Sequence, residues 1–295
     1  MSEVRSGELL VEGGLPDPSS IGTIGATFRR RDVTRACARL GRPIRKLAEY
    51  SAMGALLLLV WELAGRLSWV DTVALPTPCA VGRTVCRLLV SGTLLGHIAT
   101  SLWRVLEGFA ISAAVGLSLG LLSGISPLGA RLLDLPVQLV RPVPPIAWIP
   151  LAILWFGIGE LSKVFIIFLG AVFPIFVNTV DGIRQTDVRF IELARVLSVS
   201  RLKLIRSVVV PGALPAIMTG LRLGVGNAWI CVLAAELIAA ERGIGYVIVD
   251  GRELSQPDVV IAGMLAIGVV GKLMDFGLKR LEVRVFSWKR QYTGD

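Results

Sequence analysis

Long apolar stretches alternate with short polar segments along most of the chain. A helix needs about 20 predominantly apolar residues to cross the hydrocarbon core of a bilayer. By that measure the sequence predicts six membrane-spanning helices, with approximate bounds at residues 50–67, 105–124, 136–156, 163–180, 216–239 and 259–278. The pattern therefore predicts an all-α integral membrane protein.

The third of these stretches is rich in proline. Residues 136–156 contain Pro142, Pro144, Pro145 and Pro150. Proline removes a backbone donor and breaks a helix in water, but neighbouring helices in a bundle can satisfy the freed carbonyl groups. We expect a broken or kinked span here.

The second predicted span is preceded by an amphipathic segment and carries a face of small residues. Residues 94–104, which precede it, have the pattern of a short amphipathic helix that lies along the membrane surface. Within the span, Gly116, Gly120 and Gly124 recur every four residues, which favours close packing against another helix.

A long polar connection, residues 181–215, lies between the fourth and fifth spans. Thr186 or Asp187 can cap a helix, whose apolar positions then recur at helical spacing through residue 197. A second short helix is expected after Ser200, with Pro211 ending it. The connection is thus predicted to be a helix-turn-helix, although periodicity alone also allows a basic loop that binds anionic lipid headgroups.

Composition supports a membrane protein. Hydrophobic residues make up 54% of the 295 positions and charged residues 18%, with a mean hydropathy of +0.70. A soluble protein usually carries charge on about a quarter of its positions. The net charge of +9 does not indicate nucleic-acid binding, because Lys and Arg flank apolar spans and form no stripe interleaved with aromatic residues.

The distribution of Lys and Arg predicts the orientation. With a cytoplasmic N-terminus, the inner side receives most of them, and the outer side keeps fewer, among them Arg104 and Lys163. Both termini are then expected in the cytoplasm. We divide the chain into a disordered basic tail (1–46), the first span with an external segment (47–92), a transmembrane core (93–279) and a second cytoplasmic tail (280–295).

Motifs for catalysis or metal binding are missing from the sequence. The four cysteines have no Cys-x-x-Cys spacing, His97 is the only histidine, and no complete phosphate-binding loop occurs. We therefore expect neither catalysis nor a bound cofactor in this polypeptide.

A few polar residues inside the predicted spans are candidates for contact with a solute. An ionisable side chain at the bilayer centre costs about 2.5–3.5 kcal/mol on insertion scales. Arg141 and Arg222 are each expected either to bind an anionic solute or to pair with a carboxylate, and an interhelical hydrogen bond explains Asn227 equally well. The candidate set is Arg141, Arg222, Asn227, Trp229 and Glu236.

The residue order in the long polar connection resembles a known family pattern. Glu192-Leu193-Ala194 is followed by three residues and Ser198, then by nine residues and Val208-Val209-Val210-Pro211. The EAA loop of ABC importer permeases reads Glu-Ala-Ala, three residues, Gly, nine residues, Ile-x-Leu-Pro. The spacing matches throughout. Ser198 replaces the family glycine, so the turn is either built differently or strained.

This resemblance implies a fold, partners and coupling residues. It implies the type I ABC importer fold in a bacterial plasma membrane and a homodimer of permeases. It also implies a cytoplasmic ATPase dimer that holds ATP and magnesium, and a periplasmic or lipid-anchored solute-binding protein. The short helix would dock on the ATPase, with the coupling residues Glu192, Leu193, Ala194, Arg195, Ser198, Arg201 and Pro211.

A second resemblance concerns the solute. Residues 141–151 and 155–159, together with Ala234-Ala235-Glu236 and residues 243–246, are similar to permeases for nitrate, sulfonate, taurine and bicarbonate. A small anionic solute is therefore expected, with a pyrimidine or thiamine precursor as an alternative within the same family. An ion-coupled secondary transporter and a membrane-embedded scaffold or enzyme subunit are the alternatives from other classes.

Overall fold

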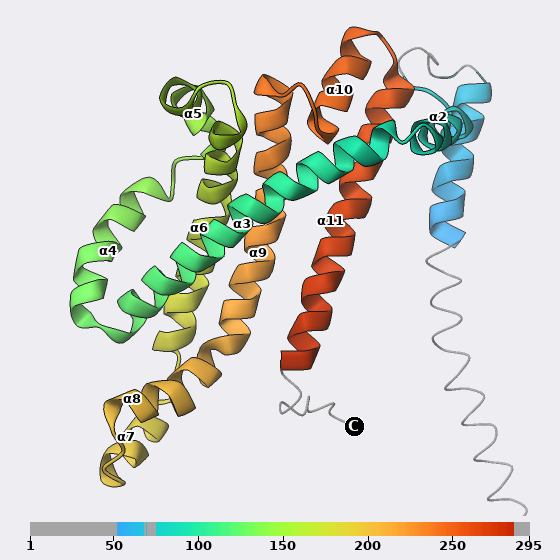
Figure 1. The fold of residues 1–295 in the computed structure, drawn as a ribbon. Coiled ribbons are helices and arrows are strands. Elements are labelled where there is room, and N and C mark those ends of the chain that lie inside the picture. Colours follow the sequence, from blue (N-terminus) through green and yellow to red (C-terminus); the bar gives the residue numbers. More distant parts are fainter. Residues whose placement is uncertain (1–51, 68, 70–74, 286–295) are drawn as a thin grey trace, which may run out of the picture. The chain divides into compact units, whose positions relative to one another are not determined.

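The computed structural model describes residues 52–67, 69 and 75–285 (Figure 1). The chain divides into two units, Met1–Leu63 and Ala64–Asp295. A helix over residues 52–66 falls within the first predicted span. The start of that span, the predicted N-terminal tail (1–46) and most of the predicted C-terminal tail (280–295) lie outside the described residues.

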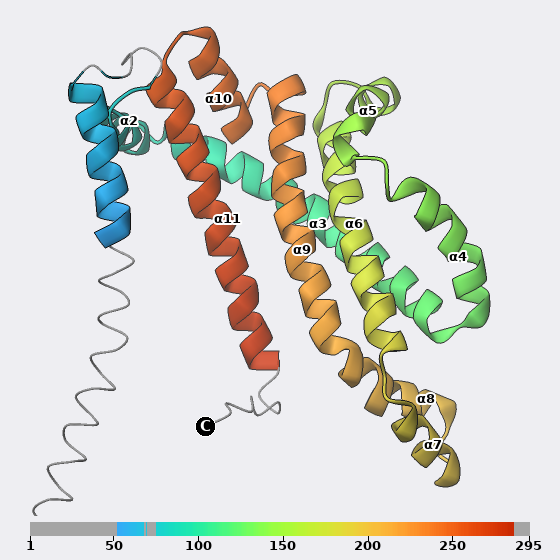
Figure 2. The same ribbon diagram turned by 180° about the vertical axis from the view of Figure 1, so that it is seen from behind.

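The second unit is built from helices, and the residues described there include no strand. Two views of the unit show α6, α9 and α11 running in the same general direction, with α3 crossing them obliquely (Figures 1 and 2). In chain order the elements are α2 (Pro78–Val90), α3 (Thr93–Ile125), α4 (Pro127–Val140), η1 (Pro145–Trp148), α5 (Ile149–Phe156), α6 (Glu160–Arg184), α7 (Val188–Val196), α8 (Arg201–Leu204), η2 (Ile205–Val209), α9 (Val210–Ala239), α10 (Ile244–Glu253) and α11 (Pro257–Val285).

Four helices of the described chain are long and apolar enough to cross a membrane. They are Thr93–Ile125, Glu160–Arg184, Arg201–Ala239 and Pro257–Glu282. They correspond to the second, fourth, fifth and sixth predicted spans. A fifth candidate is the bent pair formed by Pro127–Val140 and Pro145–Phe156.

The bent pair is the proline-rich third stretch, and it is broken as predicted. Its two halves meet at an angle of 84°. The first half begins earlier than expected, at Pro127, where the Ser126 hydroxyl accepts the Gly129 amide at 3.4 Å and caps the helix. The α-helical hydrogen bonds end with the Arg141 amide, which donates to the Val137 carbonyl at 2.9 Å, because Pro142 has no amide to continue them.

The expectation of a separate surface helix over residues 94–104 is wrong. α3 runs without interruption for 33 residues from Thr93 to Ile125, so these residues form its first three turns. Arg104, which suggested an exposed position, is only 3% exposed because its charge has partners inside the bundle. A buried charge with such partners no longer needs water.

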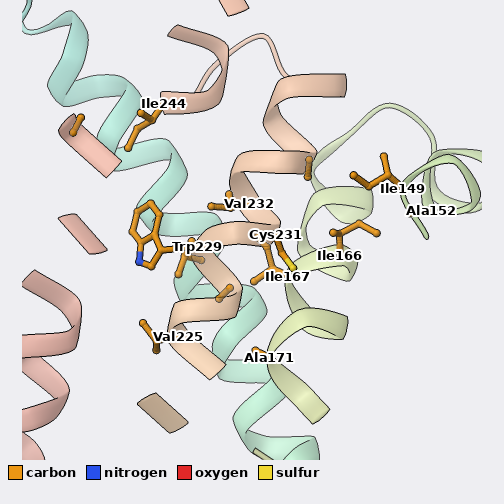
Figure 3. Close-up of a cluster of buried hydrophobic side chains, with 14 of the residues drawn as sticks. Ile149, Ala152, Ile166, Ile167, Ala171, Val225, Trp229, Cys231, Val232 and Ile244 are labelled. Atoms are coloured by element: carbon orange, nitrogen blue, oxygen red, sulfur yellow. The ribbon is translucent and has the colours of Figure 1, made fainter. Parts of the chain in front are cut away.

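The core of the unit centres on α6, which packs against both α3 and α9. Buried side chains from these helices meet Ile149 and Ala152 of α5 and Ile244 of α10 (Figure 3). Trp229 and Val232 of α9 lie within the same cluster. Side chains facing away from this cluster are largely apolar and exposed, as expected for a lipid-facing surface.

The glycines of α3 allow its close approach to α6. A Cβ atom placed on Gly116 would lie 3.0 Å from the Ile175 side chain, and one on Gly120 would lie 2.7 Å from Thr179 Cβ. One on Gly124 would lie 2.6 Å from Ile183. The three glycines thus form the predicted small-residue packing face.

Replacing Gly120 with alanine tests this contact. The added methyl group must displace Thr179 or separate the two helices, so Gly120→Ala should lower the free energy of unfolding by about 1–3 kcal/mol. Gly96→Ala on the same helix is the matched control, because nothing lies within 4 Å of a Cβ atom there. Thermal unfolding of the purified protein in detergent measures both; equal effects of the two substitutions would contradict the packing assignment.

Candidate functional site

The segment between α6 and α9 forms the predicted helix-turn-helix, which we call the α7–α8 loop (residues 185–209). Asp187 rather than Thr186 caps α7, since its Oδ1 accepts the Arg189 amide at 2.9 Å. The hydroxyl of Thr186 is buried and has no hydrogen-bond partner in the described structure. In Figure 1 the loop extends beyond the ends of α6 and α9.

The turn after α7 accommodates Ser198 in the conformation expected for the family glycine. Ser198 adopts a φ of +52°, the left-handed conformation that glycine favours. The Val199 amide donates to the Ala194 carbonyl at 2.9 Å, as in a Schellman motif, where the residue between helix and exit is left-handed. The serine therefore keeps the glycine-type geometry at a conformational cost of about 1–2 kcal/mol.

The expectation that Pro211 ends the second loop helix is wrong. α8 continues through a π-helical segment, Ile205–Val209, into α9, and the continuous helix runs from Arg201 to Ala239. Pro211 lies in the first turn of α9. A proline in that position is tolerated because the preceding turn has already left the regular α hydrogen-bond pattern, so the missing amide donor breaks no α-helical bond.

The surface of the α7–α8 loop is a mixture of exposed apolar and charged side chains. Among the predicted coupling residues, Ala194 is buried, at 7% exposure. Glu192 and Arg201 are exposed. The exposed apolar residues of the loop are Val188, Phe190, Leu193, Val196, Leu197 and Leu202. Apolar side chains gathered on a projecting loop are typical of a docking surface for another protein.

A buried carboxylate, a buried arginine and the exposed Glu160 form a network at the opposite end of the bundle. Glu236 of α9 is 2% exposed, and its Oε1 accepts bonds from Arg104 Nη1 at 2.7 Å and Ser101 Oγ at 2.8 Å. Its Oε2 accepts the Gly245 amide at 2.9 Å. Arg104 also donates from Nη2 to Glu160 Oε1 at 2.7 Å. One arginine thus joins α3 to both α6 and α9.

The turn into α10 is shaped around the same carboxylate. Gly243 has a φ of +131°, and a Cβ atom there would lie 2.4 Å from the Glu236 carboxyl carbon. The Ile244 amide donates to Ser101 Oγ at 2.8 Å. The first amides of α10 therefore face the buried charge, where the helix dipole favours an anion.

Sequence reasoning missed this network. It placed Arg104 and Lys163 among the external charges, whereas both are buried, at 3% and 5% exposure. Lys163 donates to Glu160 Oε1 at 3.1 Å. Glu236 itself was a candidate for solute contact, and the structure encloses its carboxylate in bonds from its own chain.

Arg222, a second candidate, is paired within the chain. Its Nε and Nη2 donate to Asp275 Oδ1 of α11 at 3.1 and 3.0 Å, and Nη1 lies 3.6 Å from Glu282 Oε2. This is the carboxylate pairing that the sequence left open as one of two explanations.

Asn227 and Trp229 also make contacts between helices. The Asn227 amide donates to the Gly170 carbonyl of α6 at 3.2 Å. Trp229 is 6% exposed, and its indole nitrogen lies 3.1 Å from the sulfur of Met274 in α11. Both side chains hold α9 to its neighbours.

Arg141 differs from the other candidates because its guanidinium has no ion pair among the described residues. It caps α4 at the break of the bent pair and is exposed. It lines a cavity of about 460 Å³ between α4 and α6, which also contains Gln138, Asp181 and Arg184. Arg184 faces Asp134 at 3.5 Å, so Arg141 is the cation of this cavity that remains free among the described side chains.

An oblique helix packed on a pair of spans, a broken span and a projecting helix-turn-helix define a membrane transport protein. The family model of the binding-protein-dependent transport system inner membrane component matches residues 116–287. The chain belongs to this family. It is therefore a multi-pass inner-membrane transport component, and the family is not one of catalytic enzymes.

Individual relatives of this chain are also transport permeases. The putative aliphatic sulfonates transport permease protein SsuC of Bacillus subtilis is 41% identical over 240 residues, covering 81% of this chain and 87% of that protein. The taurine transport system permease protein TauC of Escherichia coli is 36% identical, covering 79% and 87%. The bicarbonate transport system permease protein CmpB of Synechococcus elongatus is 39% identical, covering 62% and 66%.

A solved structure shows the same fold. A chain of the MetNI methionine ABC transporter in an inward-facing conformation superimposes with a TM-score of 0.53 at 19% identity, covering 64% of this chain and 94% of that one. The expectation of a type I ABC importer fold is confirmed.

Loss of Arg104 should destabilise the protein strongly. Arg104→Met leaves the buried Glu236 carboxylate without its cation, and breaking a buried pair in this way costs about 3–5 kcal/mol. Arg252→Gln is the control, because its side chain is 74% exposed and its contact with Glu253 measures 3.9 Å. That change should cost less than about 1 kcal/mol. Thermal unfolding in detergent compares the two; similar losses would show that the network does not hold the helices together.

Proposed function

We propose that this chain forms the transmembrane pathway of an ATP-binding-cassette importer and that a separate cytoplasmic ATPase docks on the α7–α8 loop. The observation that carries the proposal is the exposed apolar and charged surface of that loop, on a turn with glycine-type geometry at Ser198. Its residue order resembles the EAA loop, and the chain belongs to the permease family. In this proposal ATP and magnesium are bound by the partner, and this chain binds no cofactor.

The connections of the loop suit it to transmit force. α7 begins four residues after α6 ends at Arg184, and α8 is continuous with α9. α6 and α9 pack extensively against each other. A partner that moves the loop therefore moves both helices at the centre of the bundle, which is how a local contact can change the exposure of a pathway.

The proposed assembly contains two copies of this chain, an ATPase dimer and an external solute-binding protein. Few spans per chain make a single copy too small to enclose a pathway, and the family name itself includes a binding protein. Both termini are proposed to be cytoplasmic. The exposed basic residues of the loop and of the adjoining end of α6 support that orientation: Arg184, Arg189, Arg201, Lys203 and Arg206.

The proposed solute is a small anion, such as an aliphatic sulfonate, taurine, nitrate or bicarbonate. Relatives named for sulfonates, taurine and bicarbonate support this class. Arg141 supports it physically, since it lines a cavity beside the broken span and lacks an ion pair among the described residues. A planar guanidinium suits the oxygens of a sulfonate, nitrate or carboxylate-like anion.

Charge reversal at Glu192 tests the docking surface. Glu192→Lys should abolish copurification of the ATPase subunit and ATP-dependent uptake, because it places the opposite charge at the centre of the surface. Glu253→Lys is the matched control, since it makes the same reversal on an exposed residue of α10 outside the loop. Copurification is measured from detergent extracts with equal permease levels. An ATPase that still copurified with Glu192→Lys while the control behaved the same way would contradict the proposal.

Alanine at Arg141 and at Arg222 should give different defects. Arg141→Ala should raise the KM for uptake about tenfold or more at unchanged protein level, because a charged hydrogen bond to the anion is lost. Arg222→Ala should instead lower the amount of folded protein, because Asp275 loses both hydrogen bonds from the guanidinium and keeps only the contact with Lys272 at 3.9 Å. Uptake of aliphatic sulfonates, taurine, nitrate and bicarbonate by the complete transporter, with protein levels quantified, separates the two. Normal uptake with Arg141→Ala would remove Arg141 from the pathway.

A further inference from the structure

A second cavity, of about 560 Å³, lies where the α7–α8 loop joins the spans. Its walls come from the last residues of α3 and α6, from both helices of the loop and from the π-helical segment. Its lining includes Ile183, Arg184, Thr186, Arg201, Leu204 and Val209. This cavity is separate from the one that contains Arg141, although Arg184 borders both.

The cavity contains an unused hydrogen-bonding group. The Thr186 hydroxyl is buried and has no partner in the described structure. A buried hydroxyl without a partner costs free energy, and such groups are rare in native proteins. Because Thr186 lines the cavity, a rotation of its side chain would present the hydroxyl to a ligand oxygen.

Two arginines add positive charge to the same cavity. Arg201 has no ion pair among the described residues, and Arg184 makes a single contact at 3.5 Å with Asp134. Both arginines are exposed. The cavity therefore presents two cations and a free hydroxyl, a set that matches a phosphate group.

The remaining walls are apolar. Ile183 and Val209 belong to a small buried cluster, and Leu204 packs against it. These residues lie near the ends of Glu160–Arg184 and Arg201–Ala239, two helices long and apolar enough to cross a membrane, so the cavity is expected at the headgroup region. A free phosphate ion would gain nothing from such walls, whereas a lipid can place its headgroup at the arginines and its first methylene groups against them.

The backbone is irregular where the cavity forms. The π-helical segment Ile205–Val209 borders it, and π-helical turns occur often at functional sites. Because the same segment connects the loop to α9, a ligand in the cavity would touch both the loop and the helix that the loop moves.

We propose that this cavity binds the phosphate headgroup of an anionic phospholipid from the membrane leaflet on the loop side. The bound lipid fills the joint between loop and spans and stiffens it. This lipid site is additional to the proposed transport function. Only the assignment of the loop to the cytoplasmic side rests on that function.

The test measures lipid retention by the full-length permease, extracted with the subunits that copurify and placed in nanodiscs of phosphatidylcholine with increasing phosphatidylglycerol. Retained phosphatidylglycerol is counted by native mass spectrometry. Arg201→Gln should weaken retention about fivefold, and Thr186→Val, which keeps the side-chain shape, about threefold. Arg206→Gln is the matched control, because it removes an exposed cation from the same helix outside the cavity. It should leave retention unchanged.

Three outcomes would overturn the proposal. Equal losses with Arg201→Gln and Arg206→Gln would indicate general attraction of basic residues to an anionic surface. Unchanged retention with both Arg201→Gln and Thr186→Val would remove the cavity as the site. Displacement of the lipid by inorganic phosphate at millimolar concentration would identify a phosphate site instead. Retention is measured without transport, so its failure is distinguishable from failure of the transport proposal.

Discussion

The ion pair between Arg104 and Glu236 is the constraint on which the rest of the bundle depends. Charges inside a membrane are costly unless each is paired and fully hydrogen-bonded, and here a single guanidinium satisfies carboxylates from two helices while the amide of Gly245 satisfies the remaining oxygen. The network fixes one end of α3, α6 and α9. The glycine face of α3 then determines how closely the helices approach along their length. One end of the bundle is thus held by polar bonds, and the centre by dispersion contacts between closely packed backbones.

The end of the bundle that carries the α7–α8 loop is less tightly held. The α7–α8 loop exposes apolar side chains, contains a left-handed serine and adjoins a cavity with an unpaired hydroxyl. Such features lower local stability, and regions that move in transport are drawn from the less stable parts of a structure. The Arg104–Glu236 network holds one end of the bundle rigidly, and the α7–α8 loop at the other end is less constrained. The continuous helix from Arg201 to Ala239 connects the two ends, an arrangement that suits rotation of the bundle about the network.

Local patterns in the sequence predicted much of this architecture. Apolar runs located α6, α9 and α11 to within about seven residues at each end, and the capping residues and apolar periodicity of residues 186–205 predicted the helix-turn-helix. Local patterns gave wrong predictions for residues whose interaction partners lie far away in the sequence. α3 was cut short because Arg104 looks incompatible with a span until its partner, 132 residues later, is known. Arg222 and Glu236 suggested solute binding because their partners are likewise on other helices. Pro211 suggested a helix end because the π-helical register before it leaves no local signal. Arg141 is the candidate for which the structure describes no ion-pairing partner.

The left-handed turn at Ser198 also limits how this loop can vary. Glycine would relieve the strain, and asparagine is tolerated in this conformation, but a β-branched residue would be forced out of it. Because Ala194 is buried in the same turn, a bulkier residue there would push the two loop helices apart. Many substitutions are therefore expected to be tolerated on the outer surface of the loop, where a partner could change with it. Few are expected to be tolerated at Ala194 and Ser198, which form the turn between the two helices.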